Sequence, residues 1–179
     1  MLRLALPSDV PALEALIARS AHGLSVGFYT QPEIEAVTRE VFGVDSQLVA
    51  DGTYYAVELD SQIVACGGWG KRSTGYGGDQ AKSKPERLLD PVTEAAKVRA
   101  FFVDPAMARR GLGSMLMAHC AEAAAAAGFT RLELVSTMPG VPLYEALGFG
   151  PVERFDLVLS RGTVTVPVLL MTRSLVSRT

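Results

Sequence analysis

The sequence predicts a mixed α/β (α+β) protein with one mostly antiparallel, twisted sheet of six to seven strands, helices on both faces and a central parallel β-α-β unit. Three observations predict it. Short apolar or alternating segments of strand length recur along the chain, segments with helical periodicity lie between them, and residues 97–136 read as strand, helix, strand. At 179 residues, 49% hydrophobic and 20% charged, the chain suits a single domain over 1–179.

The N-terminal elements are a strand and two helices. Residues 1–6 alternate and predict a strand, and Ser8 is placed to cap a first helix. A glycine-containing loop is expected over residues 21–30. Residues 30–33 form a Thr-x-x-Glu capping box for a second helix, which Gly43 ends.

A hairpin and a long loop follow. Two strand-like segments, 53–59 and 62–70, flank a two-residue turn and predict the hairpin. Residues 71–92 are polar, rich in glycine and basic, and predict a long loop or insertion. Such loops in compact domains are usually functional or disordered. We expect a lid that orders when a ligand binds, with plain disorder as the alternative.

The C-terminal elements contain the parallel unit. Residues 97–103 predict a strand, a helix runs to about Ala127, and 131–136 predict a strand that lies parallel to the first. A short helix and a closing hairpin, 152–160 with 163–172, complete the sheet. Pro167 lies within the last strand and predicts a sheet edge or a bulge there.

Charge and composition exclude several classes of function. The net charge of −2 provides no overall field that would attract nucleic acid or an anionic membrane, so we expect neither as a partner. The first residues lack the apolar stretch of a signal peptide, and no stretch reaches the ~18 residues of a membrane span. Cys66 and Cys120 form no disulfide framework or metal motif, so we expect buried thiols, a cytoplasmic location and no bound metal.

One stretch, DPAMARRGLGSMLM over residues 104–117, predicts a phosphate site. Two arginines and two glycines stand where a helix begins, and a helix N-terminus offers unpaired N–H groups and a positive dipole end. Glycine admits a ligand close to the backbone, and arginine pairs with phosphate oxygens. The dinucleotide-binding fingerprint fails because Leu116 takes the place of its third glycine, and the Gly-Lys-Ser/Thr of a P-loop is absent.

The chain resembles the GNAT superfamily of acetyl-CoA-dependent N-acetyltransferases. The pyrophosphate loop of that family reads Gln/Arg-x-x-Gly-x-Gly/Ala, and residues 108–113 read Ala-Arg-Arg-Gly-Leu-Gly. Ala108 departs from the pattern and removes one side-chain contact, for which Arg109 is placed to compensate. A second family motif matches residues 143–149, LYEALGF. The resemblance covers the strand order of nearly the whole chain and is weakest over 71–92.

The resemblance implies acetyl-CoA as cosubstrate and a set of residues that bind it. The strand that ends at Val103 is expected to splay from the strand at 131–136, so that pantetheine pairs with free backbone groups of Phe101 and Val103. The expected cofactor-binding residues are Phe101, Phe102, Val103, Arg109, Arg110, Gly111, Leu112, Gly113 and Ser114.

The catalytic residue implied by the resemblance is Tyr144, as proton donor to the departing thiolate. The alternative is a tyrosine that only packs against the cofactor. No general base is assigned: Lys97 stands where several family members have a carboxylate on the central strand. Asp79, Glu33 and Glu35 are candidates only by rough location.

Four other side chains have two interpretations each. We expect His119 in the core, beside the apolar stripe of its helix, and His22 in a loop that borders the acceptor pocket in this family. Trp69 and Tyr76 line that pocket or, as we favour, pack within the fold. No arrangement of a nucleophilic triad or a metal site is recognisable.

Two classes of function remain. The favoured one is an N-acetyltransferase that transfers an acetyl group from acetyl-CoA to a primary amine of a small molecule or peptide, by direct attack in a ternary complex. The alternative is a non-catalytic acyl-CoA-binding sensor or interaction module of the same fold. The sequence leaves open which amine is the acceptor and the oligomeric state, a homodimer included.

Overall fold

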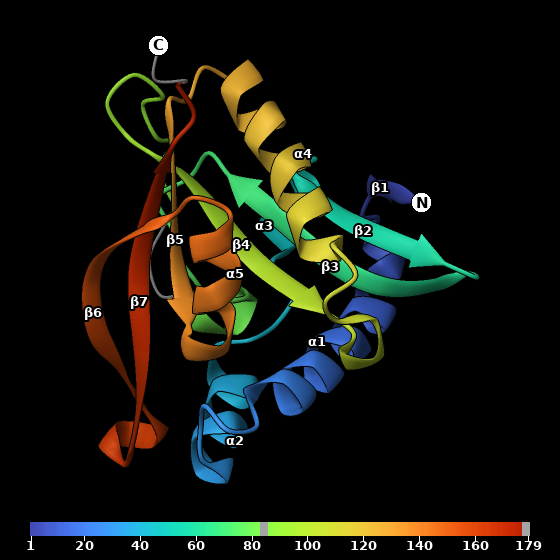
Figure 1. The fold of residues 1–179 in the computed structure, drawn as a ribbon, viewed down its shortest axis with the longest axis vertical. Helices are drawn as coiled ribbons and strands as arrows, with labels where there is room; N and C mark the ends of the chain where they lie inside the picture. Colours follow the sequence, from blue (N-terminus) through green and yellow to red (C-terminus); the bar gives the residue numbers. More distant parts are fainter. Residues whose placement is uncertain (83–85, 177–179) are drawn as a thin grey trace.

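The computed structural model describes residues 1–82 and 86–176 and confirms the predicted mixed fold (Figure 1). Within these residues one seven-stranded sheet has the strand order β1-β2-β3-β4-β5-β7-β6. The strands are β1 (Leu2–Leu4), β2 (Tyr54–Leu59), β3 (Gln62–Gly70), β4 (Ala96–Val103), β5 (Arg131–Thr137), β6 (Gly150–Leu159) and β7 (Val164–Ser174). Neighbouring strands are antiparallel except β4 and β5, which are parallel and flank α4 in the predicted β-α-β unit.

Helices cover both faces of the sheet. They are α1 (Val10–Ser25), α2 (Gln31–Glu40), α3 (Ser46–Ala50), α4 (Leu112–Ala126) and α5 (Val141–Ala146). On one face, Leu116 and Cys120 of α4 are fully buried against strands β2 to β5 and β7. On the other face, Leu13 of α1 packs with α3, and Val37 of α2 packs over β6 and β7. Burial of these apolar stripes is the main force that fixes the helices on the sheet.

The first helix is longer than the sequence predicts. The loop was expected from residue 21, but α1 continues to Ser25, and Asp9 instead of Ser8 occupies its N-cap position. A Cβ atom at Gly23 would collide with the ring of Pro105, which follows β4. Gly23 therefore allows close packing of α1 against the end of β4 and does not mark a turn.

Two local predictions are confirmed and one helix was missed. The capping box of α2 is present, with the Thr30 N–H donating to Glu33 Oε2 at 2.7 Å, and β2 and β3 form the predicted hairpin. The short helix α3 was not predicted. Asp45 caps it by accepting hydrogen bonds from the Gln47 and Leu48 N–H groups at 3.0 and 3.2 Å. Five residues are too few to display helical periodicity.

Pro167 does not lie on an edge strand, contrary to the prediction. Strand β7 is interior, between β5 and β6. The register of β5 with β7 ends at Thr137 and Val168, so Pro167 lies just beyond it. Its carbonyl accepts a hydrogen bond from the Tyr29 hydroxyl at 2.7 Å. A proline is tolerated here because no β5 residue needs its missing N–H.

The parallel strands β4 and β5 pair only where they begin. Their register consists of Ala96 with Leu132 and Lys97 with Glu133, and it ends there although β4 continues to Val103. The two strands therefore diverge along the rest of β4. This divergence confirms the splay that the family resemblance implied.

A bulge in β4 lies at the start of the divergent segment. Ala100 has a left-handed φ of 55°, and the register of β4 with β3 shifts between Cys66 and Gly68. The Tyr54 hydroxyl donates to the Ala100 carbonyl at 3.0 Å and fixes the bulge. A bulge redirects the residues that follow it.

Candidate active site

Residues 108–114, which we call the arginine-glycine loop, connect the end of β4 to α4. The backbone turns sharply here, because Arg109 and Gly111 have φ values of 62° and 80°. Glycine adopts this left-handed conformation freely, whereas most residues that carry a Cβ atom, such as Arg109, adopt it at a cost. An added Cβ at Gly111 would meet nothing within 4 Å, so the space beside this glycine is open.

The first turn of α4 offers free donors. Its first hydrogen bond runs from the Met115 N–H to the Gly111 carbonyl at 2.9 Å, and no side chain caps the helix. Within the part of the chain that the structure describes, the N–H groups of Leu112, Gly113 and Ser114 therefore have no partner. Together with the positive end of the helix dipole they form an arrangement suited to an anion.

The two glycines of the loop have different roles. Gly113 is buried, and a Cβ there would lie 2.9 Å from Leu143 Cδ2 of α5. The absence of a side chain at Gly113 thus lets α5 pack against the start of α4. This corrects the sequence interpretation that both glycines leave room for a ligand, since only Gly111 faces open space.

The arginines beside the glycines are exposed. Among the described residues, neither Arg109 nor Arg110 makes an ion pair or a hydrogen bond. Two uncompensated cations thus lie next to the free N–H groups of the α4 N-terminus. The loop concentrates positive charge in a protein whose net charge is negative.

Strand β4 presents backbone groups to the gap between β4 and β5. The Asp104 N–H donates to the Val64 carbonyl of β3 at 2.8 Å. In an antiparallel pair every second residue hydrogen-bonds to the neighbouring strand, so the backbone of Phe102, two residues earlier, also bonds to β3. The backbone of Phe101 and Val103 therefore faces away from β3. The Val103 N–H is not free as expected, because it donates to the Ser20 hydroxyl of α1 at 3.3 Å.

Phe102 is turned away from the gap. Its backbone pairs with Cys66 of β3, and its ring packs edge-on against Phe42, with 5.3 Å between ring centroids, on the face that α1 covers. The expected cofactor contacts on β4 therefore narrow to Phe101 and Val103. The bulge at Ala100 contributes to this orientation, because it reverses which side chains of β4 face α1, whereas the expectation for Phe102 came from the family resemblance alone.

Tyr144 lies on α5, next to the divergent part of β4. Its half-buried ring packs edge-on against Phe101 and Phe149, with centroid distances of 6.5 and 5.8 Å. Gly140 makes room for it, since a Cβ there would lie 3.0 Å from Tyr144 Cε2. Burial raises the pKa of the Tyr144 phenol, so this group keeps its proton at neutral pH.

The candidate bases identified by location all have structural partners. Glu33 closes the capping box of α2, Glu35 accepts from Gln31 Nε2 at 2.9 Å, and Asp79 accepts from the Ser46 N–H at 3.2 Å. Each carboxylate thereby stabilises a helix end or helix surface.

Sequence reasoning missed a carboxylate beside Lys97. Glu133 lies opposite Lys97 in the parallel register, and its Oε1 is bonded to Lys97 Nζ. The position of the absent family carboxylate is thus held by a lysine paired with an acid from the next strand. An alignment of β4 with β5 was needed to find it, and the sequence alone does not fix that register.

The remaining side chains separate into packing and exposed groups. His119 packs edge-on against Tyr55, with 4.5 Å between centroids, and Trp69 is buried against Phe129, as the packing interpretation predicted. His22 is exposed on α1. Tyr76 lines an open hollow of about 490 Å³ between α2 and β6. In the described ranges, 1–82 and 86–176, no cluster of three or more acidic, histidine or cysteine side chains suits a metal ion.

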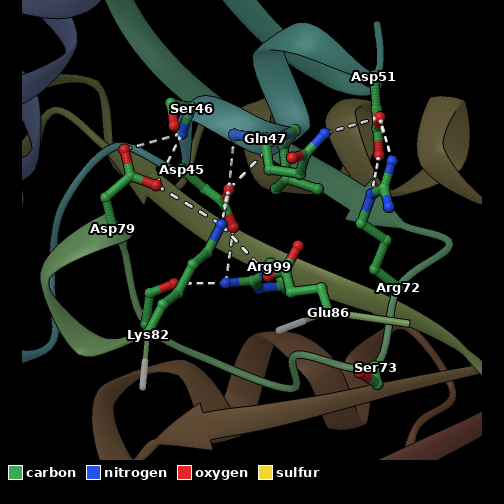
Figure 2. A network of polar contacts seen from close by, with 12 residues as sticks. Asp45, Ser46, Gln47, Asp51, Arg72, Ser73, Asp79, Lys82, Glu86 and Arg99 are labelled. Atoms are coloured by element: carbon green, nitrogen blue, oxygen red, sulfur yellow. Dashed lines mark hydrogen bonds and ion pairs between the residues drawn. The ribbon is translucent and has the colours of Figure 1, made fainter. Parts of the chain in front are cut away.

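Four charged side chains form a second polar centre, which we call the Arg99 network: Asp45, Lys82, Glu86 and Arg99 (Figure 2). Arg99 of β4 is only 5% exposed, and its Nη2 lies 2.6 Å from Oδ2 of the fully buried Asp45. Lys82 Nζ donates to Asp45 Oδ1 at 2.6 Å and lies 3.3 Å from Glu86 Oε1. Burial lowers the pKa of the Arg99 guanidinium, and the two carboxylates oppose that shift.

The Arg99 network attaches the long loop to the body of the protein. Lys82 and Glu86 belong to the loop, Asp45 caps α3, and Arg99 also donates to the loop carbonyl of Gly77 at 2.5 Å. Farther along, Arg72 forms a two-point ion pair with Asp51, at 2.8 and 3.1 Å. In the described part of 71–92, Arg72, Lys82 and Glu86 therefore anchor the loop to the body of the protein, and its role as a lid stays a prediction. Residues 83–85 lie outside the described residues.

Helices long and apolar enough to cross a membrane are not found among the described residues.

A gap between two parallel strands, a helix start with free N–H groups after the first of them, and a tyrosine beside the gap are the arrangement expected of an acyltransferase. The chain belongs to the GNAT family of acetyltransferases, whose family model matches residues 21–149. No curated protein matches the sequence.

Solved structures of the same fold span nearly the whole chain. A GCN5-related N-acetyltransferase from Rhodopseudomonas palustris is 17% identical, with a TM-score of 0.68, and the match covers 97% of this chain and 94% of that one. The PaiA N-acetyltransferase from Thermoplasma acidophilum, in complex with coenzyme A, is 12% identical with a TM-score of 0.65, covering 97% and 98%. The ribosomal-protein-S18-alanine N-acetyltransferase of Escherichia coli is 15% identical with a TM-score of 0.61, covering 100% and 96%.

Proposed function

We propose that this acetyltransferase transfers the acetyl group of acetyl-CoA to a primary amine of a small molecule or a peptide, by direct attack in a ternary complex. The single observation that carries the proposal is the seam: β4 and β5 share two register pairs and then diverge next to the arginine-glycine loop. Membership in the GNAT family supports the donor. The coenzyme A complex of the PaiA relative supports it further.

The arginine-glycine loop would hold the pyrophosphate of coenzyme A. Free N–H groups of Leu112 to Ser114 donate to the phosphate oxygens, and Arg109 and Arg110 add charge-assisted contacts. Gly111 keeps the approach open, as the empty space beside it indicates. The backbone of Phe101 and the carbonyl of Val103 face the gap, where they are placed to pair with the amides of the pantetheine arm.

Tyr144 would donate the proton that the departing thiolate needs. Thioester aminolysis breaks the carbon–sulfur bond, and the sulfur leaves more easily when it is protonated as the bond breaks. Burial keeps the Tyr144 hydroxyl protonated, and the packing of its ring between Phe101 and Phe149 fixes the direction of the O–H group. A fixed donor loses little freedom in the transition state.

One observation favours the alternative function, a non-catalytic acyl-CoA-binding sensor or interaction module. Direct attack needs an unprotonated amine, and the position of the family carboxylate holds Lys97, which is paired with Glu133. In our proposal the amine arrives neutral or loses its proton to water. Both functions therefore predict that the protein binds acetyl-CoA, and only the enzyme is expected to transfer the acetyl group to an amine.

Residues 1–179 would act as one domain in the cytoplasm. The two thiols support this location, because Cys66 and Cys120 are both free and buried, as in proteins of reducing compartments.

The test is thiol release from acetyl-CoA across a panel of primary amines. The panel contains small polyamines, amino sugars and short peptides, including one with an N-terminal alanine in view of the Escherichia coli relative. Tyr144→Phe is expected to lower kcat by about 10²-fold with little change in KM for acetyl-CoA, because it removes a proton donor and keeps the ring. Tyr55→Phe, which removes a hydroxyl from the same apolar cluster, is the control.

Binding of acetyl-CoA without turnover on any amine would favour the sensor. An unchanged kcat in Tyr144→Phe would leave Tyr144 as a packing residue only. Failure to bind acetyl-CoA at all would refute both functions.

A further inference from the structure

Strand β6 is an exposed edge of the sheet. It is the last strand in the sheet order, it pairs with β7 along its whole length, and among the described residues no strand lies on its other side (Figure 1). Side chains alternate between the two faces of the strand. Phe155 and Leu157 pack toward α2 on one face, and the exposed side chains on the other face are those of Arg154, Asp156 and Val158. In the described parts of the chain, Arg154 and Asp156 make no ion pair. An unpaired edge strand is a template for another strand.

The position of Pro167 shows which backbone groups of β6 point outward. Its carbonyl bonds Tyr29 on the β5 side of β7, so Pro167 and its register partner Asp156 are a non-hydrogen-bonded pair between β7 and β6. In an antiparallel pair, the backbone groups of alternate residues face opposite sides. The N–H and C=O groups of Arg154, Asp156 and Val158 therefore face the free edge, whereas those of Phe155 and Leu157 face β7.

This geometry restricts how two copies of β6 can pair about a two-fold axis. Two residues can exchange hydrogen bonds only if the backbone groups of both face outward. The outward-facing residues are every second residue of β6, so a two-fold axis that pairs them must pass through a residue and not between two residues. An axis through Arg154 would place Arg154 opposite itself, and an axis through Asp156 would place two carboxylates together. An axis through Phe155 instead places Arg154 of each copy opposite Asp156 of the other.

We propose that β6 pairs with β6 of a second copy of this chain, antiparallel and with the two-fold axis at Phe155, to join two sheets into one. Each copy would contribute two hydrogen-bonded residues and two opposite charges, which gives two Arg154–Asp156 pairs. Charged side chains on an edge strand ordinarily prevent pairing. Here their spacing makes the edge complementary to itself, as a two-fold interface requires.

Charge reversal tests the pairing, with sedimentation equilibrium as the measurement across a wide range of concentration. The full chain is expected to be a dimer. Arg154→Asp alone and Asp156→Arg alone each create two like-charge pairs and should raise the dimer Kd about tenfold or more. The double variant Arg154→Asp/Asp156→Arg should restore the dimer. Glu153→Lys, a reversal next to these residues whose partner would be Leu157, is the matched control.

A cysteine at the axis tests the register independently of affinity. Phe155→Cys would place two thiols opposite each other at a non-hydrogen-bonded pair, where Cα atoms about 4.5 Å apart suit a disulfide. We expect oxidation to cross-link this variant into a covalent dimer and to leave Glu153→Cys uncross-linked. Cys66 and Cys120 are buried and should not interfere.

Three results would overturn the proposal. A monomeric wild-type chain at all concentrations is the first. The second is a dimer that neither single reversal weakens, and the third is a double reversal that fails to restore the dimer while Phe155→Cys remains uncross-linked.

Discussion

Arginine has opposite roles in two regions of this molecule. In the arginine-glycine loop, Arg109 and Arg110 are exposed and have no partner among the described residues. In the Arg99 network, Arg99 is buried and surrounded by two carboxylates and a backbone carbonyl. The first region leaves its positive charge exposed, which our proposal assigns to a ligand, whereas the second neutralises it within the fold.

The difference teaches that partners, and not residue type, decide whether a charge serves binding or architecture. A buried ion pair must be complete, since removal of one member leaves the other uncompensated in a poorly solvated place. An exposed arginine costs nothing until a ligand arrives. Substitutions in the loop should therefore change binding and spare stability, and substitutions in the network should do the reverse.

The largest effect is expected from Gly111→Glu. A carboxylate would enter the open space beside the α4 N-terminus, where it repels phosphate, so acetyl-CoA binding should fall below detection in calorimetry. The left-handed φ of Gly111 adds a stability cost of about 1–2 kcal/mol.

Gly111→Asn is the control, because asparagine tolerates this conformation and adds no charge. Wild-type affinity in Gly111→Glu would refute the loop as the phosphate site. Gly113→Glu should also abolish binding, but it is less informative, since it displaces Leu143 as well.

Asp45→Ala should break the network and leave the loop site intact. Removal of the buried carboxylate leaves Arg99 without its closest ion-pair partner and removes the N-cap of α3. The free energy of unfolding, measured by urea denaturation, should therefore fall by about 3–5 kcal/mol. Asp79→Ala removes a half-exposed acid from the same region and should cost only about 1 kcal/mol. Equal losses in the two variants would contradict the network as the main anchor.

Hydrogen exchange measured without ligand should show the same contrast within the long loop. Amides near Lys82 should be protected in the wild type and exchange faster in Asp45→Ala. Fast exchange in both proteins would favour the ligand-ordered lid or the disorder that the sequence suggested.

Arg109→Ala and Arg110→Ala should each weaken acetyl-CoA binding by about 1–3 kcal/mol, the size of one charge-assisted contact. The unfolding free energy should stay within about 0.5 kcal/mol of the wild type, because neither side chain has a described partner. A variant that loses stability and keeps its affinity would reverse the assignment of roles.

The smallest effect concerns pH and the peripheral pair of Asp51 and Arg72. Hydrogen bonds from the Arg72 guanidinium hold the pKa of the Asp51 carboxyl below its ordinary value. The pair therefore stabilises the folded state fully at pH values above the pKa of aspartate in the unfolded chain, about 3.9. This stabilisation is lost as the pH falls through the lower pKa that Asp51 has in the folded protein. As the pH falls from 5 into the acid range, the free energy of unfolding from urea denaturation should fall more for the wild type than for Asp51→Asn, by about 1 kcal/mol or less.

The sequence predicted the parts of the fold that local rules control. Period, caps and turns located all seven strands to within two residues at each end, the capping box at Thr30 and the glycine that begins α4. The motif spacing located the arginine-glycine loop because its residues are contiguous. Tyr144 followed from a second contiguous motif, and its role remains a prediction.

Features that depend on distant contacts escaped prediction. Gly23 was interpreted as a turn because the proximity of Pro105 is a tertiary fact. The bulge at Ala100 turned Phe102 away from the gap, and a one-residue shift cannot be read from an apolar run. The ion pairs of Lys82 and Glu86 within the Arg99 network depend on the folded path of the loop, so its polar composition did not predict them.

The short pairing of β4 with β5 has a mechanical consequence. In the described sheet no two neighbouring strands share fewer register pairs than β4 and β5. The boundary between these two strands should therefore separate under the smallest force. A chain pulled by its two ends carries its load across that boundary, since β1 and β6–β7 lie on opposite sides of it. Under force the sheet should therefore separate first between β4 and β5, the same place where we propose that acetyl-CoA binds.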